Sequence, residues 1–261
     1  MRIMGVIPAR MASSRFPGKP LAKIGSVPMI GHVYFRSAMS KTLDDVYIAT
    51  CDDAIRTYAD SIGAKCVMTA DTHERATDRT AEALLKVEQN TQQKADIVVM
   101  IQGDEPMVVP AMIDEAVEAM VQDPTILVAN LMAKLHSRAE HDDVNEVKVV
   151  VDQHRFALYF SREPIPSWKK GAKVIPMYKQ VCIIPFRRDF LMRFNALPPT
   201  PLEVAESIDM LRVLEHGEKV KMIETKYATY SVDTEEDLRR VEKLMHGDAL
   251  VPQYRRQGVP H

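Results

Sequence analysis

Short apolar runs alternate with segments of helical periodicity through the first half of the sequence. Three runs are almost wholly apolar, as strands buried on both faces of a parallel sheet are; they are residues 3–7, 46–50 and 96–101. Apolar side chains at near-helical spacing occupy residues 28–40, 52–62, 79–88 and 110–122. These repeated strand–helix units predict an α/β fold with a doubly wound, mostly parallel sheet that binds ligands at the carboxyl ends of its strands.

The second half of the chain changes character. Its apolar runs have few helices between them and lie at residues 126–131, 147–152, 157–162 and 178–186. They predict a smaller mixed-β extension at about 145–190, inside a single domain of residues 1–247 that is followed by a tail at 248–261. Later segments predict a helix at 203–215, a strand at 219–223 and a last helix at 235–245.

A loop with three positive charges follows the first strand. Arg10, Arg15 and Lys19 lie near two serines, and Pro17-Gly18 indicates a shaped turn between the last two cations. Guanidinium and ammonium groups can share the oxygens of a phosphate chain, so the loop predicts a site for a polyanion, with a triphosphate as the first candidate. The alternative is a set of solvated surface cations in a strand–helix connection.

The overall charge indicates that these cations have a local role. A formal net charge of -2 argues against a general nucleic-acid or anionic-membrane surface, so we expect a small anion as partner, no nucleic acid and no membrane. The cysteines Cys51, Cys66 and Cys182 are widely spaced and odd in number, which suits reduced thiols. With no run of about 18 apolar residues in the sequence, we expect a cytoplasmic protein.

Two aspartates follow predicted strands. Asp104 comes after Gly103 at the end of an apolar strand, and Asp233 comes just before the last helix. Carboxylates beside a triphosphate loop suit Mg²⁺, because this metal completes its octahedron with phosphate and water oxygens. Asp104 and Asp233 are therefore the candidate ligands of a Mg²⁺ cofactor. For Asp233 the alternative is an N-cap of the last helix, although Thr234 with Asp237 offers a competing capping box.

Several segments resemble one enzyme family. Residues 6–10 (Val-Ile-Pro-Ala-Arg) and 14–21 (Ser-Arg-Phe-Pro-Gly-Lys-Pro-Leu) look like the signature loop of the sugar-acid cytidylyltransferases, in particular the CMP-Kdo (3-deoxy-manno-octulosonate) synthetase family. Residues 102–106 (Gln-Gly-Asp-Glu-Pro) and 232–238 (Val-Asp-Thr-Glu-Glu-Asp-Leu) look like the two metal-bearing motifs of that family. The resemblance extends over nearly the whole chain, from residue 7 to about residue 245.

The resemblance implies a Rossmann-like nucleotidyltransferase fold and a Mg²⁺-dependent reaction of CTP with Kdo or a Kdo-like acid, giving a CMP-sugar and pyrophosphate for lipopolysaccharide or another surface glycan. The implied catalytic residues are Arg10, Lys19, Asp104 and Asp233. The implied nucleotide-binding residues are Ala9, Arg10, Ser14, Arg15, Lys19, Thr77, Asp78 and Arg79. The implied sugar-acid pocket contains Gln102, Arg162, Gln180 and Glu206. Because relatives in the family are commonly dimers, we also expect a homodimer.

Two segments depart from the family pattern. Where relatives carry His-x-Ser-Gly-Thr-Asp-Arg, residues 73–79 are His-Glu-Arg-Ala-Thr-Asp-Arg, and Gln180 stands where relatives carry a histidine. These departures leave open an amino-modified ulosonate or a phosphonate as the acceptor. A non-catalytic nucleotide-binding protein on the same fold is a further alternative. Without the resemblance, Arg162 would be interpreted as part of a surface ion pair and Glu206 as a solvated helix residue.

Overall fold

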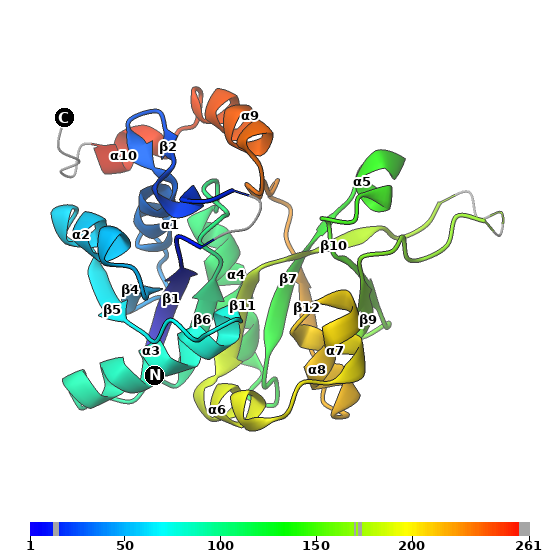
Figure 1. Ribbon diagram of the computed structural model, residues 1–261. Helices are drawn as coiled ribbons and strands as arrows, with labels where there is room; N and C mark the ends of the chain where they lie inside the picture. Colours follow the sequence, from blue (N-terminus) through cyan, green and yellow to red (C-terminus); the bar gives the residue numbers. More distant parts are fainter. Residues whose placement is uncertain (13–15, 170, 172–173, 256–261) are drawn as a thin grey trace. The chain divides into compact units, whose positions relative to one another are not determined.

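The computed structural model describes residues 1–12, 16–169, 171 and 174–255 (Figure 1). The chain forms two compact units: unit 1 comprises Met1–Asp114 and the chain from Thr229 onward, and unit 2 is Glu115–Ala228. Unit 2 is thus one continuous segment inserted between two parts of unit 1. It is larger than the expected extension at 145–190, because strands on both sides of that range join the same sheet.

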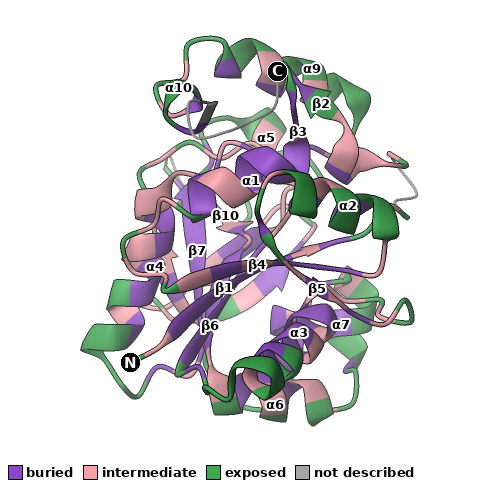
Figure 2. Ribbon diagram, turned by 90° about the vertical axis from the view of Figure 1, so that its left-hand side faces the viewer, coloured by how far each residue is buried: buried purple, intermediate pink, exposed green. Residues whose placement is uncertain are grey.

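Unit 1 is built on parallel strands. They are β1 (Ile3–Ala9), β4 (Asp45–Thr50), β5 (Lys65–Met68) and β6 (Ile97–Ile101). Within unit 1 their order is β6-β1-β4-β5, and each neighbouring pair is parallel. All residues of β6 are apolar and buried, as expected for a strand covered on both faces (Figure 2). The predicted parallel sheet is therefore confirmed.

Helices cover both faces of this sheet. Helices α1 (Met29–Ser37) and α2 (Asp53–Ser61) lie on one face, and α3 (Ala76–Thr91) lies on the other (Figures 1 and 2). This arrangement is the predicted doubly wound fold. The short elements between β1 and α1 are the 3₁₀ helix η1 (Lys19–Leu21) and the hairpin strands β2 (Lys23–Ile24) and β3 (Val27–Pro28). Helix α4 (Pro110–Gln122) contains the point where the chain passes from unit 1 to unit 2.

The returning chain completes unit 1 with α9 (Glu235–Met245) and α10 (Val251–Arg255), which lie beside α1 and β2 (Figure 1). Tyr254 is 1% exposed, stacks on Phe35 with ring centroids 5.4 Å apart, and shares a 2.7 Å hydrogen bond between its hydroxyl and His32 Nδ1. Arg36 forms a 2.8 Å ion pair with Asp248. The expected tail at 248–261 therefore begins with a packed helix, and residues 256–261 lie outside the description.

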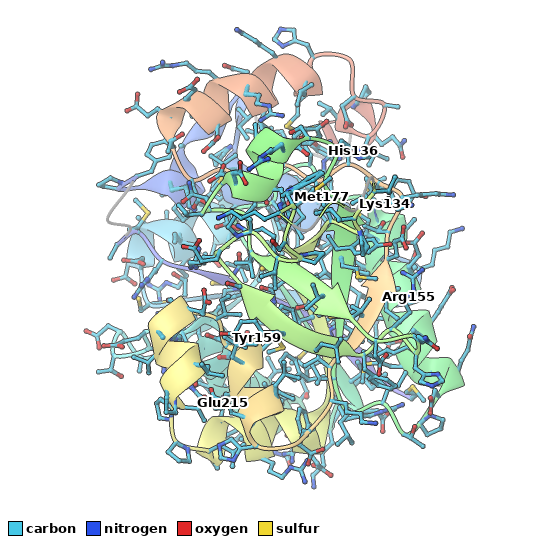
Figure 3. The ribbon with its side chains drawn as sticks, turned by 90° about the vertical axis from the view of Figure 1, so that its right-hand side faces the viewer. Lys134, His136, Arg155, Tyr159, Met177 and Glu215 are labelled. Atoms are coloured by element: carbon cyan, nitrogen blue, oxygen red, sulfur yellow. The ribbon has the colours of Figure 1, made fainter. Side chains whose placement is uncertain are left out.

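Unit 2 contains a mixed sheet. Its strands are β7 (Ala129–Lys134), β8 (Lys148–Val151), β9 (Ala157–Ser161), β10 (Tyr178–Val181) and β12 (Lys221–Glu224), in the order β12-β7-β10-β8-β9. The β7–β12 pair is parallel and the other pairs are antiparallel, which confirms the predicted mixed-β part. Glu224 on β12 forms ion pairs with Lys134 at 3.2 Å and with Arg155 at 2.6 Å. Figure 3 labels these two cations on the same side of unit 2. These contacts tie the ends of β7 and β12 to each other and to the turn between β8 and β9.

The remaining elements of unit 2 are the strand β11 (Ile183–Arg187) and the helices α5 (Arg138–Asp142), α6 (Arg188–Ala196), α7 (Pro201–Glu206) and α8 (Met210–Glu215). The single helix expected at 203–215 is wrong, because Ser207 adopts a left-handed conformation with φ 54° and ends α7. A buried bidentate ion pair between Glu203 and Arg212, with contacts of 2.6 and 2.7 Å, joins the two helices across the break. Among the described residues, no helix has both the length and the apolar composition needed to cross a membrane.

Candidate functional site

Three charged side chains of unit 1 meet at one point. Lys19 Nζ lies 2.9 Å from Asp104 Oδ2 and 3.3 Å from Asp233 Oδ1. The side chains are mostly shielded from water, with Lys19 13% exposed. Burial alone would lower the pKa of Lys19, but the Asp104 and Asp233 carboxylates outweigh it and raise the pKa, so the ammonium is charged at neutral pH. The structure thus brings together three of the four predicted catalytic residues.

The backbone around Asp104 explains this convergence. A Cβ atom on Gly103 would lie 3.1 Å from the carbonyl oxygen of Pro8 and 3.2 Å from Ile30 Cδ1, so glycine allows the turn after β6 to approach the end of β1 closely. Val232 N donates a 2.9 Å hydrogen bond to the carbonyl oxygen of Asp104. This hydrogen bond holds the returning chain against the turn and helps to place Asp233 beside Asp104.

The N-cap of α9 is Thr234, not Asp233. Thr234 Oγ1 accepts a hydrogen bond from Asp237 N at 3.2 Å, and Asp237 Oδ2 accepts in return from Thr234 N at 2.9 Å. The N–H group of Asp233 also donates to Asp237 Oδ2 at 3.1 Å. This capping box supplies hydrogen-bond acceptors for backbone N–H groups at the start of the helix. The Asp233 carboxylate is not needed there and extends to Lys19 instead. The interpretation of Asp233 as a cap is therefore excluded.

The loop that carries Lys19 is anchored at both ends. Met11 N donates to Asp52 Oδ2 at 2.8 Å, and Gly18 N donates to the carbonyl oxygen of Met11 at 3.0 Å. Gly18 has a φ of 76°, which a residue with a side chain rarely adopts, and it immediately precedes η1. The turn predicted from Pro17-Gly18 is thus present. The predicted nucleotide-binding residues Ser14 and Arg15 lie outside the described residues.

Arg10 follows Ala9, the last residue of β1, and its Nη1 donates a 3.4 Å hydrogen bond to the carbonyl oxygen of His73. The His73 ring bonds to Glu82, whose carboxylate also accepts from Ala70 N at 2.9 Å and pairs with Lys86 at 2.7 Å. Burial alone would raise the pKa of Glu82, but these hydrogen bonds lower the pKa to about 2. Glu82 thus holds the segment of residues 70–73 in place.

The other predicted nucleotide-binding residues lie at the start of α3. Thr77 is fully buried, Asp78 is half-buried, and Arg79 is 3% exposed. The guanidinium of Arg79 bonds the Thr69 hydroxyl and the carbonyl oxygen of Ala70, while its Nη2 atom is buried and has no hydrogen-bond partner in the described part of the chain. Arg79 therefore fixes the end of β5. Contact between these residues and a nucleotide stays a prediction.

The acceptor residues predicted in unit 2 form two separate polar groups. In the first, Glu206 accepts from Ser161 Oγ and from Arg162 N, each at 2.8 Å. The guanidinium of Arg162 donates to the carbonyl oxygens of Glu206 at 2.7 Å, Val144 at 3.1 Å and Ser207 at 3.4 Å. The structure thus brings Arg162 and Glu206 together as partners of each other. Glu206 is therefore not a solvated helix residue, and Arg162 is not part of a surface ion pair. Contact between these two side chains and a sugar acid stays a prediction.

The second group is centred on Asn130. This asparagine is fully buried, and its Nδ2 donates to the carbonyl oxygens of Val181 at 2.6 Å and Leu131 at 3.0 Å. Its Oδ1 accepts from Gln180 Nε2 at 2.6 Å. Asn130 is not among the residues predicted from the sequence, although one amide inside a largely apolar strand is a signal for it. The remaining predicted acceptor residue, Gln102, is half-buried in unit 1, directly after β6.

Comparison with known proteins assigns the family. A cytidylyltransferase family profile matches residues 4–220. The chain is 43% identical to a 3-deoxy-manno-octulosonate cytidylyltransferase of Geobacter metallireducens, over 94% of this chain and 98% of the relative. It is also 43% identical to one of Syntrophobacter fumaroxidans, over 96% and 99%. The chain belongs to the CMP-Kdo synthetase family of cytidylyltransferases.

Solved structures agree with this assignment. A CMP:2-keto-3-deoxy-manno-octonic acid synthetase complexed with CTP is 39% identical and has a TM-score of 0.86, covering 94% of this chain and 99% of that one. A cytidylyltransferase of Leptospira borgpetersenii, 17% identical with a TM-score of 0.63, shares the fold alone. The predicted Rossmann-like nucleotidyltransferase fold of this CMP-Kdo synthetase family member is therefore confirmed.

The carboxylates of this CMP-Kdo synthetase family member fit a divalent cation. Asp104 and Asp233 already converge on one positive charge, and Asp104 Oδ1 is a buried oxygen with no hydrogen-bond partner among the described residues. Across all the residues that the structure describes, no group of three or more His, Cys, Asp or Glu side chains is placed to hold a metal. Two carboxylates are nevertheless sufficient for Mg²⁺, which takes its other oxygens from phosphate and water.

Proposed function

We propose that the protein is a 3-deoxy-manno-octulosonate cytidylyltransferase, which transfers CMP from CTP to the sugar acid Kdo and releases pyrophosphate. The observation that carries this proposal is the convergence of Lys19, Asp104 and Asp233 in a chain 43% identical to enzymes of that name. We further propose that the enzyme works in the cytoplasm as a homodimer and that its product supplies lipopolysaccharide or another surface glycan.

The reaction requires no nucleophile from the protein. A hydroxyl oxygen of the sugar acid forms a bond to the α-phosphorus of CTP and gives up its proton to water, the bond from this phosphorus to the α–β bridging oxygen breaks, and pyrophosphate leaves with the electron pair. The chain therefore has to hold the two substrates in line and neutralise the phosphate charge. Lys19 supplies a permanent positive charge for this purpose, and Arg10 lies on the same loop.

Asp104 and Asp233 would hold Mg²⁺, which when bound supplies Lewis-acid neutralisation of the charge on the phosphate oxygens. The donor set supports this role, because both carboxylates are directed at one cation. The Asp104 turn is braced by Gly103 and by the hydrogen bond from Val232, so the carboxylates are held in position before any ligand binds.

The test is pyrophosphate release with each of the four common nucleoside triphosphates against Kdo, an amino-substituted ulosonate and a phosphonate. We expect release with CTP and a sugar acid in the presence of Mg²⁺, and its loss in Asp104→Asn, which removes one carboxylate charge from the site. Release with none of these acceptors would contradict the proposal and would support a non-catalytic nucleotide-binding protein. Full activity of Asp104→Asn would remove this residue from the mechanism.

An amino-substituted ulosonate is a second candidate acceptor, because of the environment of Gln180. Its Nε2 donates to Asn130 Oδ1 at 2.6 Å, which leaves the carbonyl oxygen Oε1 as the acceptor that this side chain can offer. An amino substituent on the sugar acid would donate to such an oxygen, whereas a hydroxyl can adapt to either partner. In the same screen, a clear preference for the amino acceptor over Kdo would select this alternative.

A further inference from the structure

Lys19 occupies the position at which the two metal-binding carboxylates converge. We propose that Lys19 is an internal counter-ion that holds Asp104 and Asp233 until a nucleotide draws its ammonium onto the phosphates, so that the free protein binds a divalent metal weakly. The metal then enters with or after the nucleotide. The inference rests on the proposed function for the identity of the nucleotide, but the competition between Lys19 and the metal does not depend on the acceptor.

The contacts show that the ammonium and a metal ion would compete. Lys19 Nζ contacts one oxygen of each carboxylate, at 2.9 Å and 3.3 Å. A divalent ion bound to the same two carboxylates would lie within a few Å of this ammonium, where like charges repel strongly. Repulsion between the two cations therefore favours exchange, in which the lysine leaves the carboxylates when the metal binds.

The local structure allows the side chain to move while the backbone stays in place. Ala22 N donates to the carbonyl oxygen of Lys19 at 3.1 Å, and Met29 N donates to that of Ala22 at 2.8 Å, so η1 is tied to the start of α1. The lysine side chain itself has four rotatable bonds and ends in a point charge that needs no fixed plane of partners. It can therefore swing from carboxylates to phosphates without rearrangement of the loop.

The unpartnered oxygen of Asp104 provides an independent argument. Asp104 Oδ1 is buried and has no hydrogen-bond partner among the described residues, although the other oxygen of the same carboxylate bonds Lys19. A buried acceptor without a partner is unfavourable, so the contacts from the described residues leave this carboxylate incompletely satisfied. The ammonium of Lys19 is therefore a cation that a divalent metal ion, bound by the same carboxylates, can replace.

The experiment measures binding of Mn²⁺ alone to the full chain without nucleotide, by electron paramagnetic resonance of the free ion. Lys19→Met removes the charge and keeps a side chain of similar length, and we expect it to bind Mn²⁺ at least about tenfold more tightly than wild type, because the ion no longer displaces a charged hydrogen-bond donor. Lys19→Arg keeps the charge and should bind as weakly as wild type. Lys23→Met, which removes an exposed lysine of β2, is the matched control and should leave the affinity unchanged.

A second substitution locates the ion. Asp104→Asn added to Lys19→Met should abolish the gain in Mn²⁺ affinity. If Lys19→Met binds Mn²⁺ no more tightly than wild type, or if Lys23→Met gains as much, Lys19 is not a competitor of the metal. Survival of the gain after Asp104→Asn would place the ion elsewhere and would equally overturn the inference.

Loss of Lys19 also leaves two carboxylates facing each other, which destabilises the fold. The thermal stability of Lys19→Met is therefore measured separately. We expect Lys19→Met to unfold at a lower temperature than wild type and to recover more stability than wild type when Mn²⁺ is added. Equal Mn²⁺ responses of the two proteins would contradict the inference. Because no nucleotide or acceptor is present, failure here is distinct from failure of the pyrophosphate assay, which tests the proposed function alone.

Discussion

Replacing Asp233 by asparagine should separate catalysis from helix capping. The side chain of Asp233 reaches Lys19 at 3.3 Å, whereas the cap of α9 is built by Thr234 and Asp237. Asp233→Asn therefore removes a charge from the site and leaves the capping box intact. We expect turnover to fall at least about a hundredfold, since a bound metal is worth several kcal/mol of transition-state stabilisation. The melting temperature should change little, because the asparagine carbonyl oxygen can still accept from Lys19.

Thr234→Ala is the matched control, and it should have the opposite effect. It removes the side-chain oxygen that accepts from Asp237 N at 3.2 Å, and loss of such a cap costs about 1 kcal/mol. For a chain of this size, that loss lowers the melting temperature by about 2–4 °C. Turnover of Thr234→Ala should stay close to wild type. Both variants are compared by thermal unfolding and by pyrophosphate release at saturating substrates. If Asp233→Asn instead keeps its turnover and loses as much stability as Thr234→Ala, the assignment of the two roles is refuted.

Three further outcomes are expected. Lys19→Ala should lower kcat/KM for CTP by about tenfold to more than a hundredfold, because a charge-assisted contact to the phosphates is lost; unchanged nucleotide kinetics would return Lys19 to a structural role. Hydrogen bonds hold the pKa of Glu82 at about 2 in the folded chain against 4.5 ordinarily, so its stabilising effect is complete above pH 4.5 and disappears as the pH falls towards 2. Thermal unfolding of Glu82→Gln should therefore show lower stability at neutral pH and a smaller decline over this acidic range, and an unchanged profile would contradict the argument. Gln180→His should raise the rate of pyrophosphate release with Kdo relative to the rate with the amino-substituted acid. If this ratio is the same in the variant and in wild type, Gln180 does not contribute to acceptor specificity.

The parallel part of the fold was predictable because its signals are local and strong. Each buried strand of unit 1 is a short, nearly continuous apolar run, and the carboxyl ends of such strands meet at one edge of the sheet. For that reason Asp104 and the loop that carries Lys19 could be grouped from the sequence. Asp233 follows no strand in the structure and lies 214 positions from Lys19, so it was grouped with them chiefly through the resemblance of residues 232–238 to a family motif.

Other features had no local signal. The break between α7 and α8 depends on a left-handed serine, Ser207, rather than on a glycine or proline that a sequence pattern would mark. Helix α10 has only five residues, too few for periodicity, and Tyr254 is buried through tertiary contacts with His32 and Phe35. The extent of unit 2 was also unpredictable, because the pairing of β7 with β12 is non-local. Long-range contacts decided the packing of α10 and the extent of unit 2, whereas the break at Ser207 has no residue that marks it in the sequence.

The insertion of unit 2 has a consequence for protein synthesis. Lys19 and Asp233 are 214 positions apart, so at usual elongation rates the loop with Lys19 leaves the ribosome roughly 10–40 s before its second carboxylate does. Unit 2 is one continuous segment, Glu115–Ala228, so it is complete on the nascent chain while unit 1 still lacks its returning segment and the helices α9 and α10. The nascent chain therefore completes the cluster of Lys19, Asp104 and Asp233 last, and a chain that ends before Asp233 lacks one of the two carboxylates that Lys19 contacts.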